Sequence, residues 1–210
     1  MRAMKALVRS MAYALLMVVP GVGCLGCGQR QEDSASADRL QFTVADSLLG
    51  PVCEIAGAGK GFRPPRGFER PPDSVLAFVR TRFAARAENQ GKRLLDCFID
   101  TAHGAGVLVS AIDGLSFSSD TLGYFAAYRR SMHVGTSPEP IREGEYWVES
   151  VYVKNFLIVD SLNVRFNLLC LSAGGKGAEL VYFAPRAEYA KLVRCFESSI
   201  GSLRVIKPGG

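Results

Sequence analysis

Only two histidines, His103 and His133, occur in the 210 residues of this chain, which limits the acid–base chemistry available to it. A Ser-His-Asp hydrolase requires a histidine beside its nucleophile, and the sequence contains no Gly-x-Ser-x-Gly nucleophile turn. Asp96, Asp100 and Asp113 offer carboxylates for glycoside hydrolysis near one predicted sheet edge. Turn and edge positions explain the same aspartates, so we assign no catalytic residue and expect a protein that is not an enzyme.

Four cysteines fall in the predicted domain, and their spacing bears on metal, disulfide and packing roles. They are Cys53, Cys97, Cys170 and Cys195. No Cys-x-x-Cys pair occurs among them, so the sequence predicts no metal site, no redox motif and no cofactor. An exported protein can form disulfides, and Cys170 with Cys195, complemented by Cys53 with Cys97, is one of the three pairings. As the alternative, each thiol is a small hydrophobic group on or near an apolar stripe.

Two basic segments raise the question of a phosphate or anion site. Residues 56–61 read Ala-Gly-Ala-Gly-Lys-Gly, but Glu54 stands where a P-loop needs its first glycine and Gly61 where it needs Ser or Thr. Nucleotide binding is therefore not predicted. Arg80, Arg82 and Arg86 lie off the apolar stripe of a predicted helix. We interpret them as a solvated face, with an anion site as the alternative.

The first 23 residues have the three-part layout of a secretory signal peptide. Basic residues come first, an unbroken run of apolar and small residues plus one tyrosine extends from Met11 to Val19, and Pro20 to Gly23 interrupt it. This run is shorter than the roughly 20 apolar residues that a membrane-spanning helix requires. We therefore interpret residues 1–23 as a leader that is removed.

The small residues ahead of Cys24 resemble a bacterial lipoprotein signal, although Gly21 stands where the usual pattern has leucine or a similar residue. The resemblance implies that Cys24 becomes the first mature residue and carries the lipid, with Cys27 as the alternative. Several acyl chains on one cysteine hold a protein firmly on a membrane. We therefore expect an envelope protein, lipid-anchored with its domain in the periplasm or at the cell surface. An ordinary cleaved signal is the remaining interpretation.

Loss of this leader lowers the formal net charge from +5 to about +2. Nucleic-acid binders have a much stronger basic field, so we expect no nucleic-acid partner. Residues 24–39 form a predicted tether, because residues 28–38 include no large apolar side chain. We assign residues 40–206 to a single domain and residues 207–210 to a tail.

Apolar periodicity and turn residues predict three helices and about six strands. The helices span residues 73–87, 121–132 and 185–201, and the middle one is expected to bury Leu122, Phe125 and Ala126. The strands span residues 93–100, 106–112, 146–154, 156–159, 164–171 and 180–183, with short extended pieces at 41–44 and 203–206. Adjacent hairpins favour an antiparallel sheet. We expect an α+β fold: a central antiparallel sheet with about three helices packed on its faces.

This order of elements resembles the PsbP-like superfamily over about residues 62–205. The shared features are Pro65-Arg66-Gly67-Phe68, the strand end Tyr182-Phe183-Ala184-Pro185 and the helix ending Glu197 to Leu203. Its members include an extrinsic photosystem II protein, a nuclear import factor that binds a small GTPase, and bacterial lipoproteins. The resemblance implies a sheet with helices on both sides and a binding or accessory role. With two histidines, metal and photosystem roles do not carry over.

Three functional hypotheses follow. The leading one is a membrane-anchored, non-catalytic accessory module that binds a protein partner in the cell envelope. The alternative is a carrier or sensor of a small apolar ligand, held in a groove between helix and sheet that aromatic side chains line. The aromatic candidates are Tyr124, Phe125, Tyr128, Tyr146 and Trp147. The third hypothesis is an envelope hydrolase that uses the aspartates or His103.

Overall fold

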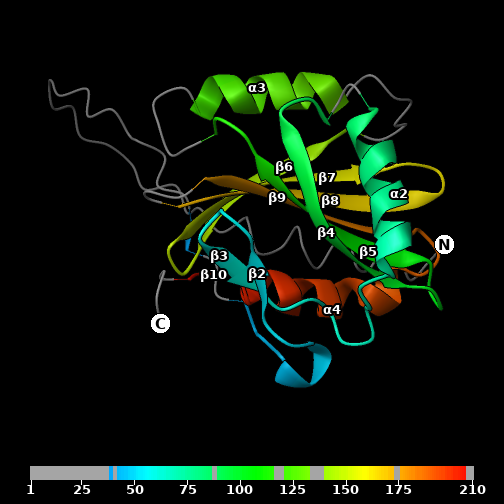
Figure 1. Cartoon of the computed structure of the whole chain (residues 1–210). Coiled ribbons are helices and arrows are strands. Elements are labelled where there is room, and N and C mark those ends of the chain that lie inside the picture. The colour runs from blue at the N-terminus through cyan, green and yellow to red at the C-terminus, as the bar shows by residue number, and fades with distance from the viewer. Residues whose placement is uncertain are drawn as a thin grey trace, which may run out of the picture. The chain divides into compact units, whose positions relative to one another are not determined.

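A seven-stranded sheet organises the part of the chain that the computed structural model describes, residues 38–39, 42–86, 89–115, 121–132, 140–172 and 176–206 (Figure 1). The predicted leader, both candidate lipidation sites Cys24 and Cys27, most of the tether, His133 and the tail 207–210 lie outside these residues. The sheet has the strand order β1-β6-β7-β8-β9-β5-β4. Each neighbouring pair is antiparallel except β1 and β6, which are parallel.

Apart from the two-residue β1, the strands of this sheet are arms of antiparallel hairpins. Their bounds are β1 Asp38–Arg39, β4 Lys92–Asp100, β5 Ala105–Ile112, β6 Arg142–Val148, β7 Val151–Val159, β8 Asn163–Leu171 and β9 Gly177–Pro185. A smaller sheet contains β2 (Cys53–Ile55), β3 (Lys60–Phe62) and β10 (Arg204–Val205), after a short 3-10 helix η2 at Asp46–Leu48. The α+β class is therefore confirmed.

Within the described residues, three α-helices accompany the sheets: α2 (Asp73–Ala84), α3 (Thr121–Met132) and α4 (Tyr189–Gly201). α3 and α4 lie on opposite faces of the large sheet (Figure 1). α4 buries Leu192, Phe196 and Ile200, which recur at helical spacing. α2 packs beside β4 through Leu76 and Phe83. Each helix thus buries an apolar stripe.

The pleat of the strands assigns alternate residues to the two faces of the large sheet. On β9, Leu180 and Tyr182 belong to the core under α4, whereas Glu179 and Val181 line the opposite face. β8 follows the same rule, because Leu168 lies in the core under α4 and Asn167 on the face toward α3. This alternation places charged and amide side chains under α3.

Three details of the sequence prediction are wrong. The predicted strand over residues 146–154 is two strands, because the chain reverses after Val148 through a two-residue turn in which Glu149 has φ 51°. Such hairpin turns need positive φ, which usually selects Asn or Gly, so this turn carries no sequence signal. Residues 42–44 form no strand, and β1 lies earlier in the chain. On α3, Leu122 and Ala126 are exposed, and Tyr128 is buried together with Phe125.

A fully buried lysine, Lys60, joins the smaller sheet to the start of β9. Its ammonium donates hydrogen bonds to the carbonyl oxygens of Ala58 at 3.1 Å and Lys176 at 2.6 Å. Burial lowers the pKa of Lys60 from its ordinary value of 10.5, and the nearby Cys170 thiol acts weakly in the opposite direction. The folded state therefore releases the Lys60 proton at a lower pH than the unfolded chain does.

The Lys60→Met variant tests this depressed pKa. Between the folded-state pKa of Lys60 and 10.5, the unfolded chain binds more protons, so this group makes the protein more stable as the pH rises. We expect the free energy of unfolding of the wild type, relative to that of Lys60→Met, to increase as the pH approaches 10.5. Urea unfolding of both proteins at several pH values measures this difference. A difference that stays flat or decreases contradicts the depressed pKa.

Candidate functional site

A cavity of about 320 Å³ lies between α2, α3 and the sheet face that α4 leaves uncovered. This volume falls at the lower end of the usual range for small-molecule sites, roughly 300–1,000 Å³. Its apolar wall consists of Val79, Phe83, Leu108, Met132, Ile158 and Val181. The apolar wall alone therefore draws on five segments that are far apart in the sequence.

The wall of this cavity contains a buried ion pair between Lys92 on β4 and Glu179 on β9. The ammonium nitrogen of Lys92 lies 3.1 Å from Oε1 and 3.0 Å from Oε2 of Glu179, and the two side chains are only 6% and 1% exposed. Ser110 Oγ donates to Oε2 at 3.3 Å, and the Tyr128 hydroxyl donates to Oε1. The carboxylate thus accepts hydrogen bonds from three side chains, the environment that a buried charge requires.

Tyr128, from α3, connects this ion pair to Asn167 on β8. Its hydroxyl accepts a hydrogen bond from Asn167 Nδ2 at 2.8 Å. Burial, and then the Glu179 carboxylate, raise the pKa of Tyr128 well above its ordinary value, so the phenol keeps its proton. The Lys92 ammonium lies 4.4 Å from the centre of the Tyr128 ring, a cation–π contact. Four side chains are consequently held in one fixed arrangement.

Three arginines, Arg82, Arg86 and Arg165, add positive charge to the cavity wall. Arg82 and Arg86 were interpreted from the sequence as a solvated face, with an anion site as the alternative. Both are exposed, yet both line the cavity, which keeps the alternative open. Arg80 instead turns toward β4, where it donates to the carbonyl oxygens of Leu94 and Leu95 beside a register shift.

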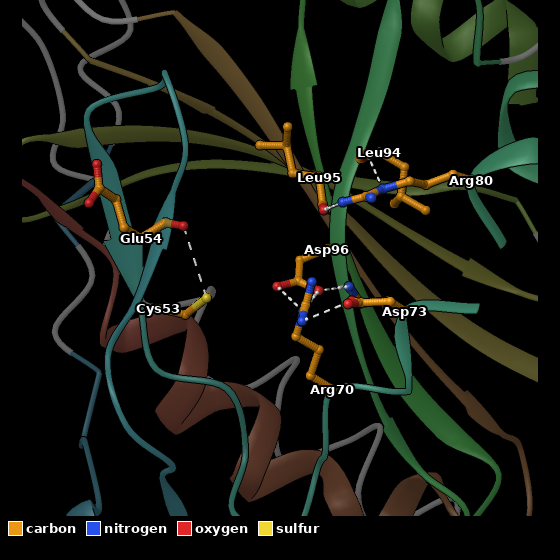
Figure 2. A network of polar contacts seen from close by, with 9 residues as sticks. Cys53, Glu54, Arg70, Asp73, Arg80, Leu94, Leu95 and Asp96 are labelled. Atoms are coloured by element: carbon orange, nitrogen blue, oxygen red, sulfur yellow. Dashed lines mark hydrogen bonds and ion pairs between the residues drawn. The ribbon is translucent and has the colours of Figure 1, made fainter. Parts of the chain in front are cut away.

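Asp96, a candidate carboxylate, belongs to a different network (Figure 2). Both of its oxygens accept hydrogen bonds from Arg70 Nε, at 2.9 and 3.1 Å, and one also accepts from the backbone N–H of Cys97. Arg70 further pairs with Asp73, the first residue of α2, at 3.3 Å. Asp96 therefore helps fix the start of α2, and it does not line the cavity.

Asp100 and Asp113 lie at opposite ends of the β4–β5 hairpin. Asp100 accepts hydrogen bonds from the N–H groups of Ala102 and His103 and contacts His103 Nδ1 at 2.6 Å. Burial alone would raise the pKa of Asp100, but these hydrogen bonds outweigh it and the pKa is lowered. Asp113 is exposed beside Gly91. The three aspartates and His103 do not meet at one site, and Asp96 and Asp100 are about 13 Å apart along β4.

All four cysteines of the domain, Cys53, Cys97, Cys170 and Cys195, are free thiols in the structure. Cys97 pairs with Leu108 and shares its sheet face, whereas Cys53 packs against the core on the other face. Cys195 lies near Asp100. The registers of β4, β5, β8 and β9 place Asp100 about 20 Å along the strands from Cys170, so Cys170 and Cys195 are far apart. Burial raises the pKa of Cys170 to about 12, typical of an inert core thiol. The structure thus contains neither disulfide that we considered.

Most polar residues of the cavity and of its ion-pair network were not singled out from the sequence. Tyr128 was predicted only as one of several aromatic side chains, and Lys92, Ser110, Asn167 and Glu179 were not predicted as site residues. One signal was present: Glu179 stands between Ala178 and Leu180 in an otherwise apolar strand. A charged side chain at such a position needs a buried partner, but the sequence does not identify which cation supplies it.

Among the described residues, no group of three or more His, Cys, Asp and Glu side chains is arranged to hold a metal ion. No helix within the same residues is long and apolar enough to cross a membrane. No protein-family model matches the chain, and a search of curated proteins finds no significant match.

Proposed function

We propose that this chain is a lipid-anchored envelope protein whose domain binds a small molecule, without catalysis, in the cavity between α2 and α3. The observation that supports the proposal is the buried Lys92–Glu179 pair, with Tyr128, in the wall of a 320 Å³ space. Ligand sites combine a mostly apolar wall with a few fixed polar groups in this manner.

The cavity wall favours a ligand with both polar and apolar parts. The sequence analysis considered a small apolar ligand in a helix–sheet groove. Of the five aromatic candidates only Tyr128 lines the cavity, and charged and amide groups form much of its wall. A purely apolar ligand would offer no donor to Asn167 Oδ1 and would displace water from the arginines, which costs free energy on binding.

Packing alone is a weak explanation for this network. Buried ion pairs are often replaceable by apolar side chains of similar volume with no loss of stability. Two apolar residues at positions 92 and 179 would also extend the neighbouring core, which contains Ile112, Phe156 and Leu169. A charged pair that lines a cavity is better suited to recognising a polar group on a ligand.

Native mass spectrometry of protein solubilised from its own membranes tests the proposal. We expect a co-purifying molecule on the wild type and none on Val181→Trp, because the larger side chain fills the cavity from β9. Leu122→Trp is the matched control, since Leu122 is exposed on α3 and does not line the cavity. If the wild-type protein is fully folded and carries no bound molecule, the proposal is wrong.

A protein partner in the envelope is the second candidate function. Two large apolar side chains support it, Phe78 on α2 and Leu122 on α3, which are 60% and 75% exposed. Both helices flank the cavity, so a partner that contacts them would also approach a bound ligand. Cross-linking in intact envelopes, with Phe78→Ser and Leu122→Ser as variants, tests this function. If wild type and variants recover the same proteins, these side chains are not the contact surface.

A further inference from the structure

Asn167, which lines the cavity, has a buried side-chain oxygen, Oδ1, that accepts no hydrogen bond from any group of the described protein. Asn167 is 8% exposed, and its Nδ2 already donates to the Tyr128 hydroxyl. A flip of the Asn167 amide would lose its hydrogen bond to Tyr128. The single hydroxyl proton of Tyr128 is donated to Glu179, so the Tyr128 oxygen can only accept from Asn167. An unsatisfied buried acceptor is unfavourable, so a donor from outside the chain would stabilise this site.

The charges on the cavity wall do not balance. Lys92 and Glu179 neutralise one another, and among the described residues that line the cavity Glu179 is the only carboxylate. Arg82 from α2 and Arg165 from β8 lie on the same wall and take part in none of the ion pairs among the described residues. Arg165 also attracts Asp160, which does not line the cavity. The wall therefore favours an anion.

The volume limits the size of this anion. A space of 320 Å³ corresponds to about ten water molecules at roughly 30 Å³ each. Allowing for tighter packing, a molecule on the order of 10–15 non-hydrogen atoms fits. Val181 and Phe83 offer apolar contacts to its body.

On the premise that the cavity is a ligand site, we propose that it recognises a small organic carboxylate that also carries a hydroxyl or amine. The carboxylate pairs with Arg82 and Arg165, the body packs on the apolar wall, and the hydroxyl or amine donates to Asn167 Oδ1. This assignment joins the two unmet requirements of the wall, an anion and a hydrogen-bond donor, in one ligand.

Three probes of nearly equal size separate these requirements: 4-hydroxybenzoate, 4-methylbenzoate, which lacks the donor, and 4-hydroxybenzamide, which lacks the charge. In titration calorimetry at low salt, we expect 4-hydroxybenzoate to bind at least fivefold more tightly than either of the other two. Arg165→Gln should remove the preference for the anion, and Asn167→Leu the preference for the hydroxyl. Arg204→Gln, on β10, removes one positive charge outside the cavity wall and should change neither.

The outcomes distinguish this inference from the proposed function. If 4-hydroxybenzamide binds as tightly as 4-hydroxybenzoate, or if native mass spectrometry identifies a neutral ligand, the anion assignment is wrong while the cavity remains a binding site. If no probe binds and no co-purifying molecule is found, the proposed function fails together with the inference. The probe series on the wild type alone is sufficient, so a variant that fails to fold does not prevent the test.

Discussion

Glu179→Leu is expected to lower the free energy of unfolding by about 3–5 kcal/mol, because it leaves the Lys92 ammonium buried without its counter-ion. The substitution also removes the acceptor of the Ser110 and Tyr128 hydroxyls. At roughly 2–4 °C per kcal/mol for a domain of this size, the loss corresponds to a fall of about 10 °C in Tm. Denaturant unfolding and thermal melts measure both quantities.

Removing Lys92 as well tests whether the loss of stability in Glu179→Leu comes from the unpaired ammonium. Lys92→Met in the Glu179→Leu background should restore most of the stability, to within about 1 kcal/mol of the wild type. The control is Lys191→Met, which breaks the exposed pair of Lys191 with Glu188 at 2.8 Å and should cost less than about 1 kcal/mol. A double variant as unstable as Glu179→Leu would show that hydrogen bonding or packing, and not the buried charge, dominates.

Phe196→Ala is expected to lower the free energy of unfolding by about 3–5 kcal/mol. The affinity of the folded variant for the ligand should not change. Phe196 is 2% exposed on α4, and its ring lies 5.3 Å from that of Tyr182 and 6.0 Å from that of Phe68, measured between ring centres. Its removal leaves a cavity in the core under α4. Because that core lies on the sheet face opposite α3, the proposed ligand site should keep its geometry.

Phe78→Ala is the matched control for this substitution. Phe78 is 60% exposed on α2 and contacts the Arg82 guanidinium, so its removal should cost no more than about 1 kcal/mol. Urea unfolding gives the stability, and titration with 4-hydroxybenzoate below the transition gives the binding. Loss of binding in folded Phe196→Ala would indicate that the two faces of the sheet are coupled.

Much of the fold follows from local patterns in the sequence. The predicted helix over residues 121–132 matches α3, and the predicted strands over 93–100, 106–112 and 164–171 correspond to β4, β5 and β8. Each depends on apolar spacing within one segment, which local sequence specifies. The β6–β7 turn was missed because Glu149 and Ser150 are not residues that such a turn usually selects.

The candidate site was not predictable by the same means. Lys92, Ser110, Tyr128, Asn167 and Glu179 come from β4, β5, α3, β8 and β9, and only the strand order places them together. The sequence drew attention to the aspartates and to His103 because their residue types are common in active sites. The fold places these residues in turns and beside α2. Residue types that are common in active sites therefore did not identify the residues around the cavity.

The most direct test of the account is a crystal structure of protein solubilised from its own membranes and never denatured. We predict electron density for an organic molecule between α2 and α3, with a hydrogen-bond donor near Asn167 Oδ1 and an anionic group near Arg165. In Val181→Trp the same density should be absent while the rest of the fold is unchanged. A wild-type cavity that contains water alone would contradict the central claim that this space is a ligand site.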